Sequence, residues 1–118
     1  MIMGVRRRLT QDDQAASPYL ELPFEVAAGV GSLEVRLAYD RSSGVVDLGC
    51  WSPSGFRGWS GGARSRFTIT ATAATPGYLP GDLEPGQWTV LLGLHRIPAA
   101  GLDVEVDIEL PASAPPDG

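Results

Sequence analysis

The chain has 118 residues, of which 43% are hydrophobic and 19% charged, so a wholly disordered chain is excluded and one domain with one core is expected. Fourteen acidic residues against nine basic ones give a net charge of −5, and every basic residue is arginine. This balance predicts that neither nucleic acid nor a membrane is a partner, because both require a basic or a long apolar surface.

Residues 1 to 16 are predicted to form a polar N-terminal tail. Three arginines at 6 to 8 precede an acidic pair at 12 and 13, and no apolar segment follows them as a secretory signal would require. Cys50 is the single cysteine, so no internal disulfide can form and a reducing compartment is allowed. These observations predict a cytoplasmic location.

Period-two alternation of apolar and polar residues dominates residues 17–110 and indicates β-strands. It is clearest in SLEVRLAYD (32–40) and LDVEVDIEL (102–110), and QWTVLLGLH (87–95) is apolar on both faces, which is typical of a central strand. Further strands are expected at 19–26, 44–51 and 65–72. The sequence therefore predicts an all-β fold, a single antiparallel β-sandwich of about 6–8 strands that is jelly-roll-like.

The segment 102–110 has an outward row of four carboxylates, at positions 103, 105, 107 and 109. Carboxylates spaced about 7 Å apart along one strand do not converge on a metal ion. The row is interpreted as a solvated strand face that discourages pairing at a sheet edge. The last segment, PASAPPDG at 111–118, has the composition of a stiff linker or tail.

The segment GFRGWSGGARSRF (55–67) is rich in glycine, arginine and aromatic residues, and it allows two interpretations. In one, arginines grip an anion or a partner and tryptophans offer flat faces for contact. In the other, glycines shape a crossing between strands, aromatic anchors pin it, and arginines satisfy loop carbonyls. The candidate binding residues of the first reading are Trp51, Arg57, Trp59, Arg64 and Arg66.

One short pattern in the sequence is typical of an enzyme. GWSGG (58–62) matches the G-x-S-x-G pattern of hydrolases, and Ser60, Asp82 and His95 follow in the order of a catalytic triad. The pattern requires a helix after the serine, and no helical periodicity follows Gly62. With one histidine and one cysteine in the chain, no metal site is expected either. The sequence predicts no enzyme activity, no catalytic residue, no metal and no cofactor.

The runs GFRGWSGGAR and ATPGYLPG, within residues 9 to 110, resemble the N-terminal domain of actinobacterial PHP-superfamily metallohydrolases, a family of carbaryl-hydrolase-like, metal-dependent phosphoesterases. The resemblance implies a β-sandwich that precedes a catalytic barrel. None of the family's metal ligands has a counterpart in these 118 residues, so its hydrolase activity is not carried over.

The resemblance implies a non-catalytic accessory domain that docks on a PHP catalytic domain, in cis or in trans, or shapes its entrance. An alanine at Arg57 or Trp59 is then expected to weaken docking and leave the fold intact. The alternative is a free-standing module that binds a carbohydrate or a small anion, with Trp51 or Trp59 at the ligand and Trp88 in the core.

Overall fold

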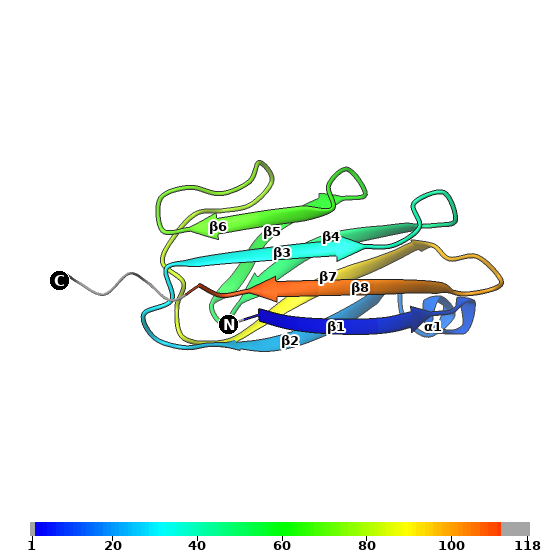
Figure 1. Cartoon of the computed structure of the whole chain (residues 1–118), viewed down its shortest axis with the longest axis horizontal. Coiled ribbons are helices and arrows are strands. Elements are labelled where there is room, and N and C mark those ends of the chain that lie inside the picture. The colour runs from blue at the N-terminus through cyan, green and yellow to red at the C-terminus, as the bar shows by residue number, and fades with distance from the viewer. Residues whose placement is uncertain (1, 112–118) are drawn as a thin grey trace.

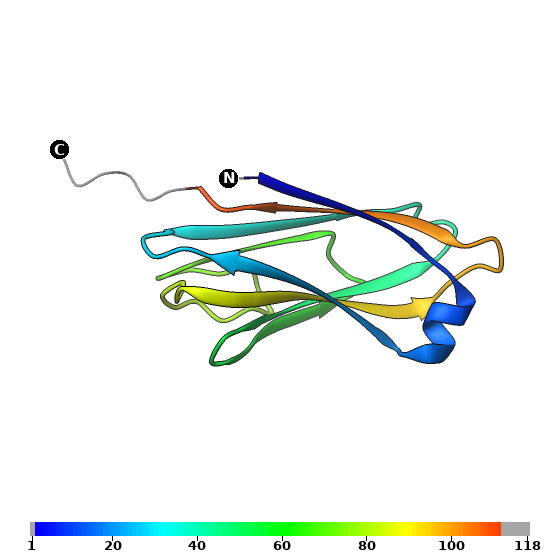
Figure 2. The ribbon, with the colours of Figure 1, turned by 90° about the horizontal axis from the view of Figure 1, so that it is seen from below.

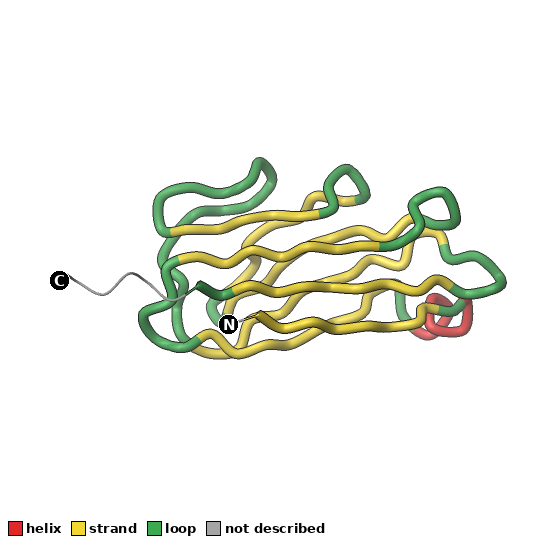
Figure 3. Tube along the Cα trace, in the orientation of Figure 1, coloured by secondary structure: helices red, strands yellow, loops and turns green. Residues whose placement is uncertain are grey.

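The computed structural model describes residues 2–111, which form two four-stranded antiparallel sheets and one short helix (Figures 1 and 3). The predicted linker 111–118 lies outside the described residues except for Pro111. The strands are β1 (Ile2–Leu9), β2 (Tyr19–Val26), β3 (Ser32–Ala38), β4 (Val45–Ser52), β5 (Gly55–Gly61), β6 (Arg66–Thr70), β7 (Gly86–Arg96) and β8 (Leu102–Glu109), and the helix is α1 (Gln11–Ala16).

The two sheets are named by their strand orders. Sheet A has the order β1-β8-β3-β6 and sheet B the order β2-β7-β4-β5. Within the described residues, β4 and β5 are the one pair of consecutive strands that share a ladder, and every other connection passes from one sheet to the other. This order is that of a jelly roll, so the predicted fold class is confirmed. Figure 2 shows the two sheets as layers, with α1 joining β1 to β2 at one end.

The core lies between the sheets, where the inward residue of each alternating pair is buried. β7 runs between β2 and β4, as its two apolar faces predicted, and the side chain of Trp88 on it is fully buried. The Trp88 indole N–H donates to the carbonyl of Glu84 at 2.9 Å, which satisfies its polar atom inside the core. The other large, fully buried side chains come from both sheets and include Leu33, Leu48, Phe67, Ile69, Leu92 and Ile108.

The prediction of a polar tail over residues 1 to 16 is wrong. β1 pairs with β8 along its whole length, and its outward arginines face the acidic row: Arg6 lies 3.7 Å from Glu105 and Arg8 3.0 Å from Asp103. β8 is consequently an inner strand of sheet A, and its acidic row does not guard an edge. The three consecutive arginines interrupt the alternation of β1, which is why the pattern did not indicate a strand.

The helix α1 also falls in the segment that was predicted as a tail. It begins with a capping box in which the Thr10 hydroxyl accepts from the backbone N–H of Asp13 and the Asp13 carboxylate accepts from the backbone N–H of Thr10. The helix has six residues, and in the described part of the chain no helix is long and apolar enough to cross a membrane.

Much of the segment 55–67, for which one of the two interpretations was a glycine-shaped crossing between strands, is the edge strand β5. Its ladder with β4 is irregular: Trp51 faces Phe56 and Gly49 faces Trp59, so three residues of β4 are matched by four of β5. Such β-bulges place Phe56 and Trp59 on the same side of the sheet although they are three positions apart. Period-two reasoning places residues three apart on opposite faces, so it could not have found this arrangement.

Gly58 and Gly55 offer a matched test of how tightly β5 is packed, since their φ angles are +156° and +152°. A Cβ at Gly58 would lie 2.7 Å from the Cα of Tyr78, whereas a Cβ at Gly55 meets no atom within 4 Å. We expect Gly55→Ala to lower the free energy of unfolding by about 1–2 kcal/mol, the cost of the backbone angle alone. Gly58→Ala should cost at least about 2 kcal/mol more, because Tyr78 must move. Urea denaturation measures both, and equal losses would contradict the packing.

Candidate functional site

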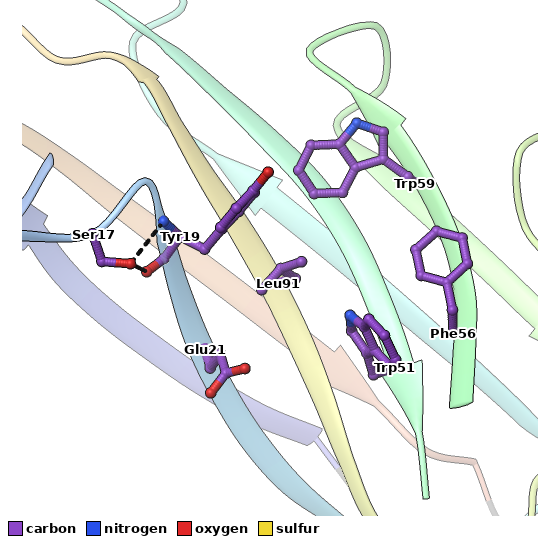
Figure 4. Close-up of a pocket in the computed structure, with 7 residues that line it drawn as sticks. All are labelled: Ser17, Tyr19, Glu21, Trp51, Phe56, Trp59 and Leu91. Atoms are coloured by element: carbon purple, nitrogen blue, oxygen red, sulfur yellow. Dashed lines mark hydrogen bonds between the residues drawn. The ribbon is translucent and has the colours of Figure 1, made fainter. Parts of the chain in front are cut away.

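Apolar side chains from all four strands gather on the outward side of sheet B. Three of them are about half exposed: Tyr19 at 52%, Trp51 at 44% and Phe56 at 47%. Large aromatic side chains that stay this exposed next to one another usually mark a contact surface. Figure 4 shows Leu91 between Tyr19 and the two tryptophans Trp51 and Trp59. We call Tyr19, Trp51, Phe56, Trp59 and Leu91 the aromatic face; with Ser17 and Glu21 they line an open groove of about 720 Å³.

The position of Trp59 depends on two glycines of neighbouring strands. A Cβ at Gly93 on β7 would lie 3.0 Å from Cη2 of the Trp59 ring, and a Cβ at Gly49 on β4 would collide with the same ring. The indole therefore lies across β4 and reaches β7, in space that only glycine leaves open. There its ring meets Tyr19 of β2 edge to face, with centroids 6.1 Å apart. The aromatic face thus extends from the β5 edge of the sheet to the β2 edge.

The rings of the aromatic face are held in two edge-to-face pairs. The second pair joins Trp51 and Phe56, with centroids 5.6 Å apart and planes at 75°. Rings fixed in this way lose little further freedom when they contact a partner. In the described residues, the indole N–H of neither Trp51 nor Trp59 donates to a protein acceptor, whereas that of Trp88 does. Two hydrogen-bond donors therefore remain available on this surface.

Of the predicted binding residues, the structure brings Trp51 and Trp59 together and separates Arg57 from them. Arg57 points inward and is 9% exposed; its guanidinium lies 4.9 Å from the centre of the Trp88 ring. It donates to the carbonyls of three loop residues, which are Leu79, Gly81 and Asp82. This geometry is the packing alternative, in which an arginine satisfies loop carbonyls, so the Arg57 guanidinium is not part of the aromatic face.

Arg64 and Arg66 lie away from the aromatic face. Arg66 opens β6 at the edge of sheet A, where its guanidinium is 3.9 Å from the Glu34 carboxylate. Both arginines line a shallow polar hollow of about 590 Å³ beside Thr68 and Thr75. The five predicted residues therefore do not form one site.

Sequence reasoning missed five members of the groove: Ser17, Tyr19, Glu21, Phe56 and Leu91. The alternation of YLELPFEV did indicate that Tyr19 and Glu21 point outward, away from the buried Leu22 and Phe24. What it could not indicate was the neighbour on that face, because β2 and β5 are the opposite edges of one sheet.

Ser60 does not form a triad with Asp82 and His95. Its hydroxyl lies 2.9 Å from the Tyr78 hydroxyl and donates to the Leu48 carbonyl at 3.3 Å. Among the hydrogen bonds of the described residues, none joins Ser60 to Asp82 or to His95. Ser60 lies on β5, and the chain continues into a turn rather than a helix, so the motif lacks the setting that its chemistry requires.

Two buried groups near β5 are held in their neutral forms. Burial raises the pKa of the Cys50 thiol to about 12, and Cys50 is fully buried, so this thiol is not a reactive nucleophile. Burial likewise raises the pKa of Tyr78 to about 12, against the opposing hydrogen bond with Ser60. The ring of Tyr78 stacks on Phe67 with centroids 4.1 Å apart, which places it in the core.

Fold and site together define a small jelly-roll sandwich with an aromatic contact face. No protein-family model matches the sequence, and a search of curated proteins finds no match. Among solved structures, a similar fold is that of Aeromonas hydrophila PliG, a periplasmic lysozyme inhibitor of g-type lysozyme. The TM-score is 0.50 and the identity 12%, over 93% of this chain and 86% of that chain. At this identity the likeness establishes the fold alone.

The comparisons contradict the resemblance to PHP-superfamily metallohydrolases. No family model links the chain to them, and a solved structure of similar fold is that of a lysozyme inhibitor. The predicted role as an accessory domain of a phosphoesterase is therefore wrong, as is the predicted PHP catalytic domain as partner. The alternative module for a carbohydrate or a small anion gains no support from the match. The cytoplasmic location is contradicted too, because a protein of similar fold is periplasmic.

The inward position of Arg57 predicts a stability effect rather than a docking effect. We expect Arg57→Met to lower the free energy of unfolding by about 3 kcal/mol, because three carbonyls lose a charged donor. The free energy of unfolding of Arg57→Lys should lie between those of this variant and the wild type, since an ammonium cannot reach all three carbonyls. Denaturant unfolding checks both, with the exposed Arg64→Met as a control that should stay within about 0.5 kcal/mol. An Arg57→Met protein as stable as the wild type would contradict a stabilising role for the hydrogen bonds of Arg57 to these carbonyls.

The buried phenol of Tyr78 predicts a loss of stability at alkaline pH. Its folded pKa of about 12 lies above the unfolded value of about 10, so its contribution is complete below about pH 10 and is lost as pH rises toward 12. Tyrosinate absorbance at 295 nm, compared between the wild type and Tyr78→Phe, locates its ionisation. We expect the difference to appear above about pH 11. A difference that is complete by pH 10.5 would show an accessible ring.

Proposed function

We propose that this protein is a non-catalytic module that binds another protein on its aromatic face. The observation that carries the proposal is the cluster of three half-exposed aromatic side chains, Tyr19, Trp51 and Phe56, on one side of sheet B. Tryptophan and tyrosine are the residues most enriched at the energetic centres of protein interfaces. Their rings are already fixed by edge-to-face contacts, which reduces the entropy lost on binding.

The shape of the surface favours a protein as the partner. The groove is open along the sheet and mainly apolar, and the two free indole N–H groups belong to tryptophans that line it. An apolar centre with a few unpaired donors is the usual composition of a protein contact surface. The lysozyme inhibitor with the same fold is itself a protein that acts on an enzyme, which makes a g-type lysozyme the first partner to test.

The absence of catalysis is part of the proposal. Ser60 is engaged by Tyr78 and Leu48, and Cys50 is buried with a raised thiol pKa. The Ser60 hydroxyl, which the sequence offered as a nucleophile, is therefore engaged in hydrogen bonds, and the single thiol is neutral. A module of this kind would act on a partner by covering its surface.

The test compares binding by the wild type and by Trp51→Ser/Phe56→Ser, a pair that is solvent-exposed and distant from the core. Calorimetric titration into a g-type lysozyme is the first measurement, and proteins captured on the immobilised chain are then purified and titrated in the same way. We expect a saturable complex that the double variant weakens at least about 30-fold, the loss typical of removing a central aromatic contact. Arg64→Ser, on the other side of the molecule, should bind as the wild type does.

The comparison decides the proposal whichever partner is found. If the g-type lysozyme does not bind the wild type, it is excluded as the partner. If every purified partner binds the double variant as tightly as the wild type, the aromatic face is not the contact surface and the proposal is wrong. Circular dichroism and urea unfolding of the double variant verify that its fold is intact.

A further inference from the structure

We infer that the groove of the aromatic face receives an arginine side chain of the partner, an inference that rests on the proposed function. The groove places one carboxylate, Glu21, beside the apolar wall formed by Tyr19, Leu91 and the tryptophans (Figure 4). A guanidinium is the group that can use both parts, because it stacks on aromatic faces and pairs with a carboxylate through two parallel N–H donors.

The charges of the two sheets differ in a way that supports a basic partner. On the strands of sheet A five arginines stand against five carboxylates, and ion pairs join Arg6, Arg8 and Arg36 to acidic neighbours. The outward side of sheet B carries three carboxylates, Glu21, Glu25 and Asp47. The basic side chains on the strands of sheet B are Arg57, which faces the core, and His95 and Arg96 at the end of β7.

Glu21 is the carboxylate best placed to meet an incoming cation. It lies opposite Leu91 in the ladder of β2 and β7, and Leu91 lies opposite Gly49, whose other neighbour is Trp59. Glu21, Leu91 and Trp59 therefore belong to one row across the sheet. In the described residues Glu21 has neither an ion pair nor a hydrogen bond through its side chain, so no internal arginine competes for it.

The size of the groove also fits an arginine carried on a partner's loop. A volume of about 720 Å³ is within the range of ligand-binding clefts and holds a long side chain together with its flanking backbone. The alkyl stem would lie on Leu91 while the guanidinium reaches Glu21. The chain already stacks arginines on its own rings, since Arg41 lies 5.6 Å from the centre of the Tyr39 ring.

The test uses small probes, so it does not require the partner. The isotope-labelled full chain is titrated with N-acetyl-arginine methylamide, and the indole N–H signals of the three tryptophans are followed by NMR. N-acetyl-citrulline methylamide is the matched control, because it has nearly the same shape without the charge. We expect saturable shifts of Trp51 and Trp59 with a dissociation constant of about 1–50 mM, silence from Trp88, and at least fivefold weaker binding of citrulline.

Two variants locate the carboxylate. Glu21→Gln should weaken the binding of the arginine probe at least fivefold. Glu25→Gln should leave the binding unchanged, because Glu25 lies on the same strand and the same side of the sheet but outside the groove. Equal losses in both variants would reveal a diffuse field and overturn the inference. Equal binding of citrulline, or no shift of Trp51 and Trp59, would overturn it as well. Neither result touches the proposed function, which depends on the Trp51 and Phe56 variants.

Discussion

The structure depends on the irregular pairing of β5 with β4. Three residues of β4, from Gly49 to Trp51, are matched by four of β5, from Phe56 to Trp59, and this mismatch turns both aromatic residues outward. In a regular ladder Phe56 and Trp59 would lie on opposite faces, and one of them would enter the core. The same bulge leaves Arg57 inward, where Trp88 and the loop carbonyls receive it. The aromatic face and the inward position of Arg57 are thus two consequences of one inserted residue.

Much of the fold could be predicted from alternation alone, because a strand with one buried side records that side in its sequence. Six strands were predicted close to their observed bounds, among them β3 and β8, whose inward residues are all apolar. β1 and β5 were missed for opposite reasons. In β1 three consecutive arginines break the pattern at an edge that is only half buried, and in β5 the bulges change the period itself.

The candidate site was only partly predictable, because it is a product of strand order. Trp51 and Trp59 were selected as aromatic residues near glycines, and both belong to the aromatic face. Tyr19 lies 40 positions before Trp59 in the sequence (19 against 59), and only the crossing connections of the jelly roll bring β2 into the same sheet as β5. The prediction of Arg57 as a binding residue failed for a related reason. Its residue type favoured binding, but the direction of its side chain depends on the bulge.

The glycines in and around β5 serve close packing. Gly49 and Gly93 leave the space in which the Trp59 ring lies across the sheet, and Gly58 admits the backbone of Tyr78 against the β5 edge. An exposed edge strand invites unwanted pairing, and the Gly58–Tyr78 bridge covers part of this one. With that edge partly covered, the aromatic face becomes the more accessible part of sheet B for a partner. The surface is therefore better suited to contact through side chains than to strand addition at β5.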